Sequence, residues 1–140
     1  MKQWMLLPLR RYFEFAGRSR PREYWSYVLF LFLAGVAINI VEAVLGLGNT
    51  AEWIYHNGWS MSAGVRREGG PLFGLFALAT FIPTLAVAVR RLHDSDRSGW
   101  WILLGFIPLI GQIWLLVLMI VGGTRGPNRF GPDPVEHPPV

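Results

Sequence analysis

Three long stretches of this chain carry almost no charge. Residues 24–51 contain one charged residue, Glu42, and residues 69–89 and 98–124 contain none. A soluble amphipathic helix needs polar residues every three or four positions to form an outward face, and these stretches have no such face. The pattern therefore predicts helices that are surrounded by lipid.

The lengths of these stretches predict three transmembrane spans. A helix rises about 1.5 Å per residue and the hydrocarbon core is about 30 Å thick, so roughly 20 apolar residues cross it. The candidate spans are Tyr24 to Leu47, Leu72 to Val89 and Trp100 to Val121. None shows the alternation of a membrane strand. We expect an all-α, multi-pass membrane protein in which residues 1–140 form a single domain.

The remaining segments are expected at the membrane surfaces. They are an outer loop at 48–71, an inner loop at 90–99 and a tail at 122–140. The first fifteen residues, MKQWMLLPLRRYFEF, mix aromatic and aliphatic side chains with basic ones. This mixture is typical of a segment that lies in the headgroup plane, and its apolar run is too short for a signal peptide.

The distribution of Lys and Arg predicts the orientation. Six basic residues precede the first span and the loop at 90–99 adds three, whereas the loop at 48–71 has two, balanced by two glutamates. Basic loops stay on the cytoplasmic side of a membrane. We therefore expect the N-terminus and the 90–99 loop inside, and the 48–71 loop outside.

The segment from Trp100 to Val121 allows two paths. A continuous helix would be about 33 Å long, enough to cross, and we expect this path, with a kink near Pro108 and the tail outside. The alternative is a re-entrant hairpin whose arms, Trp100 to Ile107 and Ile113 to Val121, are each about half a bilayer long. Its turn would have to satisfy its own backbone groups inside the protein, and two other spans offer little room for that.

Composition agrees with a membrane protein. Of the 140 residues, 52% are hydrophobic and 16% are charged, below the roughly 25% charge of soluble domains. The formal net charge is +4, and the segment from Lys2 to Glu23 carries six positive and two negative residues. We expect anionic membrane lipids as partners, with a protein partner or a homo-oligomer as further possibilities, and no nucleic acid.

The segment RRLHDSDRSGWW, residues 90–101, concentrates charge between two apolar stretches. Its arginines suit the C-terminal end of a helix, which leaves His93 and Asp94 unexplained. An acid/base pair is one interpretation. We favour a structural polar cluster, because neighbours on a turn rarely face each other and a carboxylate at the membrane boundary needs a partner. The expected partner is one of Arg18, Arg20, Arg22, Arg90, Arg91 and Arg97.

Metal and cofactor sites are not expected. A metal needs three or four converging His, Asp or Glu ligands, and His56 and His137 lie in segments far from His93, Asp94 and Asp96. The chain has no cysteine, which excludes disulfides and thiolate ligands.

Two polar residues lie inside the first predicted span. Asn39 and Glu42 are three residues apart and share one helix face. An ionisable group inside a span is a functional hypothesis by default. Glu42 is roughly 8 Å from the outer end, which favours an interfacial carboxylate, with a proton or cation site as the alternative.

Three motifs together resemble a known family. They are FAGRSRPREYW, IPTLAVAVRRLHDSDRSGWW and IPLIGQIWLLVLMIVGGTRGPNRFGPDP. In this order and spacing they are similar to the domain of unknown function 805 (DUF805) family of small bacterial inner-membrane proteins. The resemblance implies a compact helical bundle in the bacterial inner (plasma) membrane, and it implies no activity. The long 48–71 loop departs from the short connection of that family.

Two classes of function are open. The first, which we favour, is a non-enzymatic membrane module that binds anionic lipid headgroups or a partner protein through the six arginines named above. The alternative is a membrane enzyme that acts on a phosphorylated or lipid substrate at the RRLHD loop, with Arg91 and Arg97 holding phosphate and His93 transferring a proton. An oligomeric transporter component is a third hypothesis.

Overall fold

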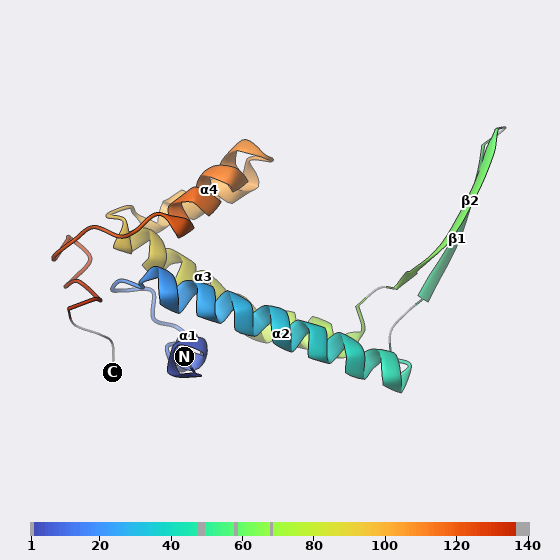
Figure 1. The fold of residues 1–140 in the computed structure, drawn as a ribbon, viewed down its shortest axis with the longest axis horizontal. Coiled ribbons are helices and arrows are strands. Elements are labelled where there is room, and N and C mark those ends of the chain that lie inside the picture. Colours follow the sequence, from blue (N-terminus) through green and yellow to red (C-terminus); the bar gives the residue numbers. More distant parts are fainter. Residues whose placement is uncertain (1, 48–49, 58, 68, 137–140) are drawn as a thin grey trace. The chain divides into compact units, whose positions relative to one another are not determined.

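The fold consists of helices and one β-hairpin. A computed structural model describes residues 2–47, 50–57, 59–67 and 69–136. Figure 1 traces the elements along the chain. In order, they are α1 (Lys2–Arg10), α2 (Pro21–Leu45), β1 (Thr50–Asn57), β2 (Ser60–Arg67), α3 (Pro71–Asp94), the 3₁₀ helix η1 (Gly99–Phe106) and α4 (Ile110–Ile120).

The chain forms two compact units, and α2 and α3 contribute to both. The first unit comprises residues 1–31 and 80–140, and the second comprises residues 32–79. Each unit is described by itself below.

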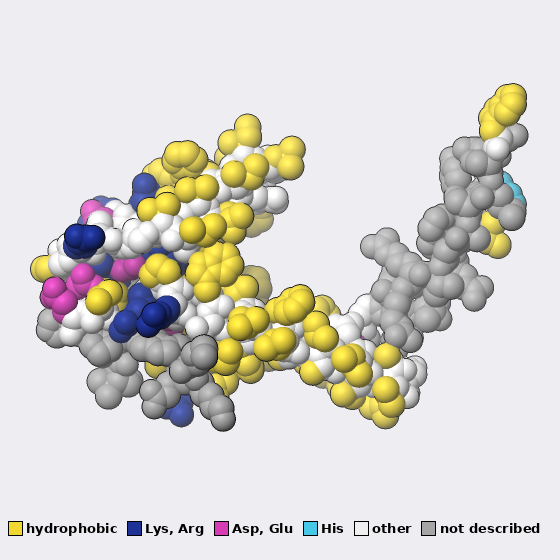
Figure 2. All heavy atoms as spheres, viewed as in Figure 1, with side chains coloured by type: hydrophobic (Ala, Val, Ile, Leu, Met, Phe, Trp, Pro, Cys, Tyr) yellow, Lys and Arg dark blue, Asp and Glu magenta, His cyan; other side chains and the backbone are white. Residues whose placement is uncertain are grey.

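The two long helices have the length and composition of membrane spans. Each begins with a proline, Pro21 in α2 and Pro71 in α3, at the position where a missing N–H costs no helical hydrogen bond. Both are long and apolar enough to cross a membrane, and only 11% and 28% of the residues in their most apolar windows are buried in the protein. Figure 2 shows these hydrophobic side chains at the surface. A helix from the core of a soluble protein would have buried them.

In the first unit, α2 and α3 run antiparallel and contact each other through polar groups. The Tyr27 hydroxyl lies 3.4 Å from Thr84 Oγ1, and one turn earlier in α2 the Glu23 carboxylate lies 3.4 Å from the Arg90 guanidinium. A small hydrophobic core forms next to these contacts. It consists of Leu92, Leu118 and Met119, with Tyr24, Ile102 and Leu115 packed against them.

In the second unit, the 48–71 loop contains a β-hairpin. Strands β1 and β2 pair antiparallel from Thr50 opposite Arg67 to Asn57 opposite Ser60. The expected all-α class omitted this hairpin. In the sequence, two residues separate Asn57 from Ser60, and the first of them is glycine; glycine at the first position of a two-residue loop is a signal for a hairpin turn. The helical interpretation of the apolar stretches is correct.

The continuous third helix expected from Trp100 to Val121 is wrong. Helix η1 ends at Phe106 and α4 begins at Ile110. The two arms pack side by side, because a Cβ on Gly105 would lie 3.3 Å from Leu115 and a Cβ on Gly111 would overlap the Leu104 carbonyl oxygen. The segment is therefore a hairpin that doubles back, and Pro108 lies in its turn.

Two backbone hydrogen bonds close the turn within the segment itself, which answers part of the objection to a hairpin. Ile107 N–H donates to the Leu104 carbonyl at 2.9 Å, and Ile110 N–H donates to the Pro108 carbonyl at 2.8 Å. Pro108 itself has no N–H to satisfy. Between them Leu109 adopts φ 62° and ψ −70°, a γ-turn that reverses the chain at some cost in strain.

The close contact at Gly111 gives a test of the hairpin. In an unhindered helix, alanine is more stable than glycine by about 1 kcal/mol, but a Cβ at Gly111 also meets Ile107 Cβ at 2.8 Å. We expect Gly111→Ala to destabilise the protein by about 1–3 kcal/mol through overpacking. Thermal unfolding in detergent, followed by circular dichroism, measures this loss.

Gly122→Ala is the matched control, because a Cβ there meets nothing within 4 Å. It should unfold at the temperature of the wild type. Equal melting temperatures for the two variants would contradict the packing of η1 against α4.

Candidate functional site

The charged groups of the first unit converge at the C-terminal end of α3. Figure 2 shows Lys, Arg, Asp and Glu side chains gathered in this unit, away from the apolar helix surfaces. The centre is Asp94, the last residue of α3. Only 2% of Asp94 is exposed.

Two arginines hold the Asp94 carboxylate, one on each oxygen. Arg18, from the segment before α2, places Nη2 2.9 Å and Nε 3.0 Å from Oδ1. Arg91, one turn back in α3, places Nη1 2.9 Å from Oδ2. All three side chains are almost completely buried. The ion pair expected for Asp94 is therefore confirmed, with two partners. We call Arg18, Arg91 and Asp94 the arginine–aspartate cluster.

The spare N–H groups of both arginines bind backbone carbonyls of the C-terminal segment. Arg18 donates to Thr124 O at 2.5 Å and to Gly126 O at 2.6 Å. Arg91 donates to Met119 O at 3.3 Å and also to Val121 O. Buried guanidinium groups need such acceptors to offset their lost hydration. The cluster thus fixes the end of α4 and the start of the tail.

The tail also binds the backbone of α3 directly. Thr124 donates to the Asp94 carbonyl through its N–H at 2.8 Å and its hydroxyl at 3.1 Å. The Asn128 side-chain amide donates to the His93 carbonyl at 2.9 Å. A Cβ on Gly123 would overlap the Asp94 carboxylate, so only glycine fits there. The expectation that the tail leaves on the far side of the membrane is contradicted by these contacts.

His93 is held by two groups that sequence reasoning did not identify. Its Nδ1 lies 3.2 Å from the Gly17 carbonyl oxygen, which can only accept, so Nδ1 carries the proton. Its ring stacks on Phe130 at a centroid distance of 3.9 Å. The structure does not bring His93 and Asp94 together as an acid/base pair, because both Asp94 oxygens bind arginines.

A second ion pair lies deeper between α2 and α3. Glu23 and Arg90 are fully buried, and their closest charged atoms are 3.4 Å apart. Among the described residues, neither carboxylate oxygen and no guanidinium nitrogen of this pair has a hydrogen-bond partner. Removing one partner would leave an uncompensated buried charge, which costs about 3–5 kcal/mol.

The six arginines predicted to bind lipid or a partner therefore divide into two groups. Arg18, Arg90 and Arg91 are buried and belong to the ion pairs described above, so they cannot face a headgroup. Arg22 is exposed, and Arg20 and Arg97 are partly exposed. Three further arginines, Arg10, Arg125 and Arg129, are exposed as well, and Arg129 forms an ion pair with Asp96.

Glu42 is a helix cap in the second unit. Only 2% of it is exposed, and its carboxylate accepts N–H groups at the start of α3, from Leu72 at 2.6 Å and from Gly70 and Phe73 at 3.0 Å. These N–H groups have no intrahelical partner, and the negative charge suits the positive helix end. Asn39 is exposed and donates to Gly35 O of its own helix at 2.8 Å. The structure does not bring Asn39 and Glu42 into one polar site.

The tail contains a smaller carboxylate-centred turn. Asp133 accepts N–H groups from Val135 at 2.8 Å and Gly126 at 2.9 Å, and these bonds lower the pKa of its carboxyl. A lowered acid pKa means that the ionised form stabilises the turn above about pH 3.9 and that this contribution is lost as the pH falls through the lowered value.

No three His, Asp or Glu side chains converge as metal ligands within the part of the chain that the structure describes. Asp96 instead forms an exposed ion pair with Arg129, at 3.2 Å. His137 lies outside the described residues.

Comparisons with known proteins agree with the sequence motifs. The family model described as "Protein of unknown function (DUF805)" matches residues 12–132. The chain belongs to the DUF805 family. Relatives from Escherichia coli K12 include "Inner membrane protein YhaI", 44% identical over 94% of this chain and 95% of its own, and "Inner membrane protein YhaH", 37% identical over 96% of this chain and 98% of its own.

A more distant relative is "Uncharacterized protein YiiR" of Escherichia coli K12, 25% identical over 95% of this chain and 89% of its own. No solved structure matches this DUF805 chain. The names of YhaI and YhaH place those two proteins in the inner membrane, and none of the three names states an activity.

The arginine–aspartate cluster predicts a large difference between two neighbouring aspartates. Asp94→Asn leaves Arg18 and Arg91 buried without a counter-charge, so we expect it to lower the free energy of unfolding by about 3–5 kcal/mol. Denaturant unfolding in detergent and the yield of folded protein both report this loss.

Asp96→Asn is the control, since it removes the same charge from an exposed pair that contributes at most about 1 kcal/mol. Asparagine also tolerates the left-handed conformation of this residue, φ 56°. Equal tolerance of both substitutions would contradict the central role of Asp94.

The Glu42 cap predicts a local effect. Glu42→Gln replaces a carboxylate acceptor with an amide, and we expect about 1–3 kcal/mol of local destabilisation. Hydrogen exchange at the Leu72 and Phe73 amides should accelerate about tenfold or more, while Asn39→Ala should leave it unchanged. Unchanged exchange in Glu42→Gln would show that the cap is not needed.

Proposed function

We propose that this protein is a two-span inner-membrane protein with a re-entrant hairpin and with both termini in the cytoplasm. In this topology α2 and α3 cross the membrane, and η1 and α4 enter one leaflet and return. The excess of basic residues before α2 and in the 90–99 loop supports a cytoplasmic location for that end. The names of the relatives support the inner membrane.

The lengths of the hairpin arms fit this topology. The eight residues of η1 rise about 16 Å at 2.0 Å each, and the eleven residues of α4 rise about 16 Å at 1.5 Å each. Each arm matches one leaflet of a hydrocarbon core about 30 Å thick. The short helix α1 would then lie along the headgroup plane, with Arg10 exposed.

The function that this arrangement supports best is a non-enzymatic membrane module that binds anionic lipid headgroups. The observation that carries the proposal is the division of the arginines. The buried arginines stabilise the fold, whereas Arg10, Arg22 and Arg125 remain exposed, at the end where the headgroups would lie. Each basic residue near an anionic leaflet contributes roughly 1 kcal/mol of attraction.

The other two hypotheses have less support. An enzyme at the RRLHD loop would need Arg91 for phosphate and His93 for proton transfer, but Arg91 is buried against Asp94 and the His93 ring is stacked on Phe130. A transporter would need a polar pathway, and the candidate for one, Glu42, is a helix cap.

Spin-labelled lipids in reconstituted vesicles test the proposal. The wild type should immobilise phosphatidylglycerol in preference to phosphatidylcholine. Arg22→Gln with Arg125→Gln should reduce that preference, by up to about fivefold for each arginine, since 1 kcal/mol corresponds to about that factor.

The matched control is Arg66→Gln with Arg67→Gln, which removes two charges from β2 in the opposite loop. In vesicles with anionic lipid confined to the cytoplasmic-equivalent leaflet, this control should keep the wild-type preference. The proposal fails if the Arg22→Gln, Arg125→Gln variant also keeps the wild-type preference for phosphatidylglycerol. A partner protein would then be the better explanation of the exposed arginines.

A further inference from the structure

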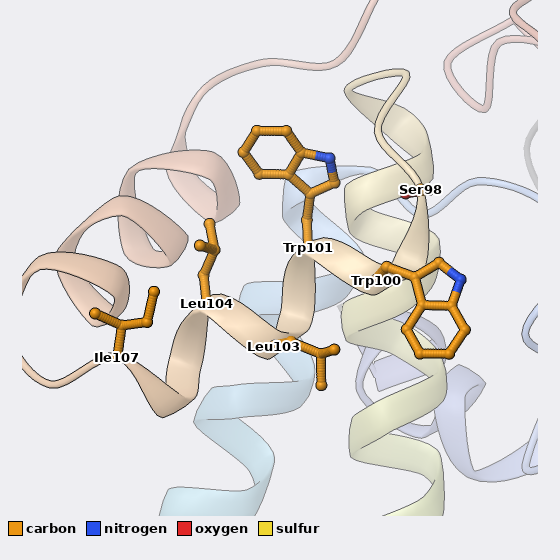
Figure 3. Close-up of a pocket in the computed structure, with 6 residues that line it drawn as sticks. All are labelled: Ser98, Trp100, Trp101, Leu103, Leu104 and Ile107. Atoms are coloured by element: carbon orange, nitrogen blue, oxygen red, sulfur yellow. The ribbon is translucent and has the colours of Figure 1, made fainter.

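The start of the re-entrant hairpin carries an open apolar groove. It has a volume of about 370 Å³ and is lined by Ser98, Trp100, Trp101, Leu103, Leu104 and Ile107. Figure 3 shows Trp101, Leu104 and Ile107 projecting from successive turns of the ribbon, with Ser98 at the end nearest α3. The groove thus has a polar end and an apolar length.

The 3₁₀ conformation produces this groove. In a 3₁₀ helix residues three apart are eclipsed, so Trp101 and Leu104 align with Ile107 just beyond the helix, and Trp100 aligns with Leu103 in the neighbouring row. An α-helix would rotate each such residue away from the one before it. Eight residues are an unusually long run for a 3₁₀ helix, and this run keeps the two rows parallel.

A cation lies at the polar end of the groove. The Arg97 guanidinium carbon is 5.6 Å from the centre of the Trp101 ring, a cation–π distance. Its Nη1 donates only a long bond, 3.4 Å, to the Ser95 carbonyl. Among the residues that the structure describes, Arg97 forms no ion pair. The neighbouring carboxylates of Asp94 and Asp96 bind other arginines.

The length of the groove along the membrane normal also fits one kind of molecule, a phospholipid. The groove follows an arm that is about as long as one leaflet is thick, roughly 15 Å. A phospholipid has a phosphate at the membrane surface and acyl chains that extend over that same depth. Arginine is suited to phosphate through its planar fork of donors, and tryptophan favours the interface between headgroups and acyl chains.

We infer that the groove binds one anionic phospholipid, with its phosphate at Arg97 and Ser98 and one acyl chain along Trp101, Leu104 and Ile107. This inference rests on the proposed function, since it requires the polar end of η1 to lie at headgroup level. It differs from the surface attraction of Arg22 and Arg125, because a groove holds one lipid and saturates.

Native mass spectrometry of the detergent-purified full chain tests the inference. Delipidated protein is titrated with dioleoylphosphatidylglycerol or with dioleoylphosphatidylcholine, and the one-to-one adduct is measured. The wild type should form a saturable one-to-one adduct that favours phosphatidylglycerol. Arg97→Gln should weaken phosphatidylglycerol binding about fivefold and should weaken phosphatidylcholine binding less, because the choline of phosphatidylcholine already compensates its phosphate.

The acyl part of the site is tested by filling the groove. Ile107→Trp should remove the adduct with either lipid, whereas Ile113→Trp makes the same substitution at an exposed position of α4 outside the groove and should keep it. If Ile107→Trp does not fold, Leu103→Trp fills the groove from the neighbouring row and should give the same result. Wild-type adducts in a folded, groove-filled variant would overturn the inference, as would the absence of a saturable adduct in the wild type.

The two proposals fail separately. Arg22→Gln with Arg125→Gln should keep the one-to-one adduct, while Arg97→Gln should keep most of the surface preference measured with spin-labelled lipids. Loss of the adduct with an intact surface preference refutes the groove alone. An intact adduct with no surface preference refutes the proposed function of the exposed arginines alone.

Discussion

The Asp94 carboxylate, held between the guanidinium groups of Arg18 and Arg91, is the interaction on which the first unit depends. Three charged groups removed from water cost several kcal/mol each unless every donor and acceptor is satisfied. One carboxylate cannot satisfy two guanidinium groups. The remaining N–H groups bind carbonyl oxygens between Met119 and Gly126. Because unsatisfied buried N–H groups of the two arginines would be costly, the end of α4 must lie next to the end of α3, where its carbonyls accept from them.

This constraint explains why the last apolar segment doubles back. A continuous helix would carry Val121 about 33 Å from Trp100, too far for its carbonyl to reach Arg91. The reversal at Leu109 is strained, but Pro108 removes one donor from the turn and local hydrogen bonds satisfy its neighbours. The hairpin is thus stabilised at both ends: by the buried ion pairs where it meets α3 and by the internal hydrogen bonds of the turn at Pro108 and Leu109.

Much of this fold was predictable from side-chain types, and the parts that were not depend on the backbone. Long uncharged stretches predicted the helices. The ion pair of Asp94 was predicted because six arginines are expected at the same membrane boundary as Asp94. Which arginines would be buried was not predictable, because the carbonyls that accept from Arg18 and Arg91 have no sequence signal. The stacking of His93 on Phe130 joins residues 37 positions apart, which no local pattern reveals. The glycine directly after Asn57 was present in the sequence as a turn signal, and it indicates the β-hairpin.

The buried and exposed arginines have different consequences for function. Those in the ion pairs set the path of the chain, because their side chains are held by Asp94, Glu23 and backbone carbonyls. In the proposed function, those that remain exposed contact anionic lipid headgroups, and the apolar outer surfaces of the helices contact the acyl chains. Inner-membrane relatives of nearly equal length fit this interpretation.

The most direct test of the account is the side of the membrane on which the tail lies. The chain has no cysteine, so single-cysteine variants can be labelled with a membrane-impermeant maleimide in spheroplasts, before and after permeabilisation. The account predicts that Arg22→Cys and Glu136→Cys react only after permeabilisation, while His56→Cys reacts in intact spheroplasts. Labelling of Glu136→Cys from outside, with Arg22→Cys still protected, would mean that the last apolar segment crosses the membrane and would contradict the account.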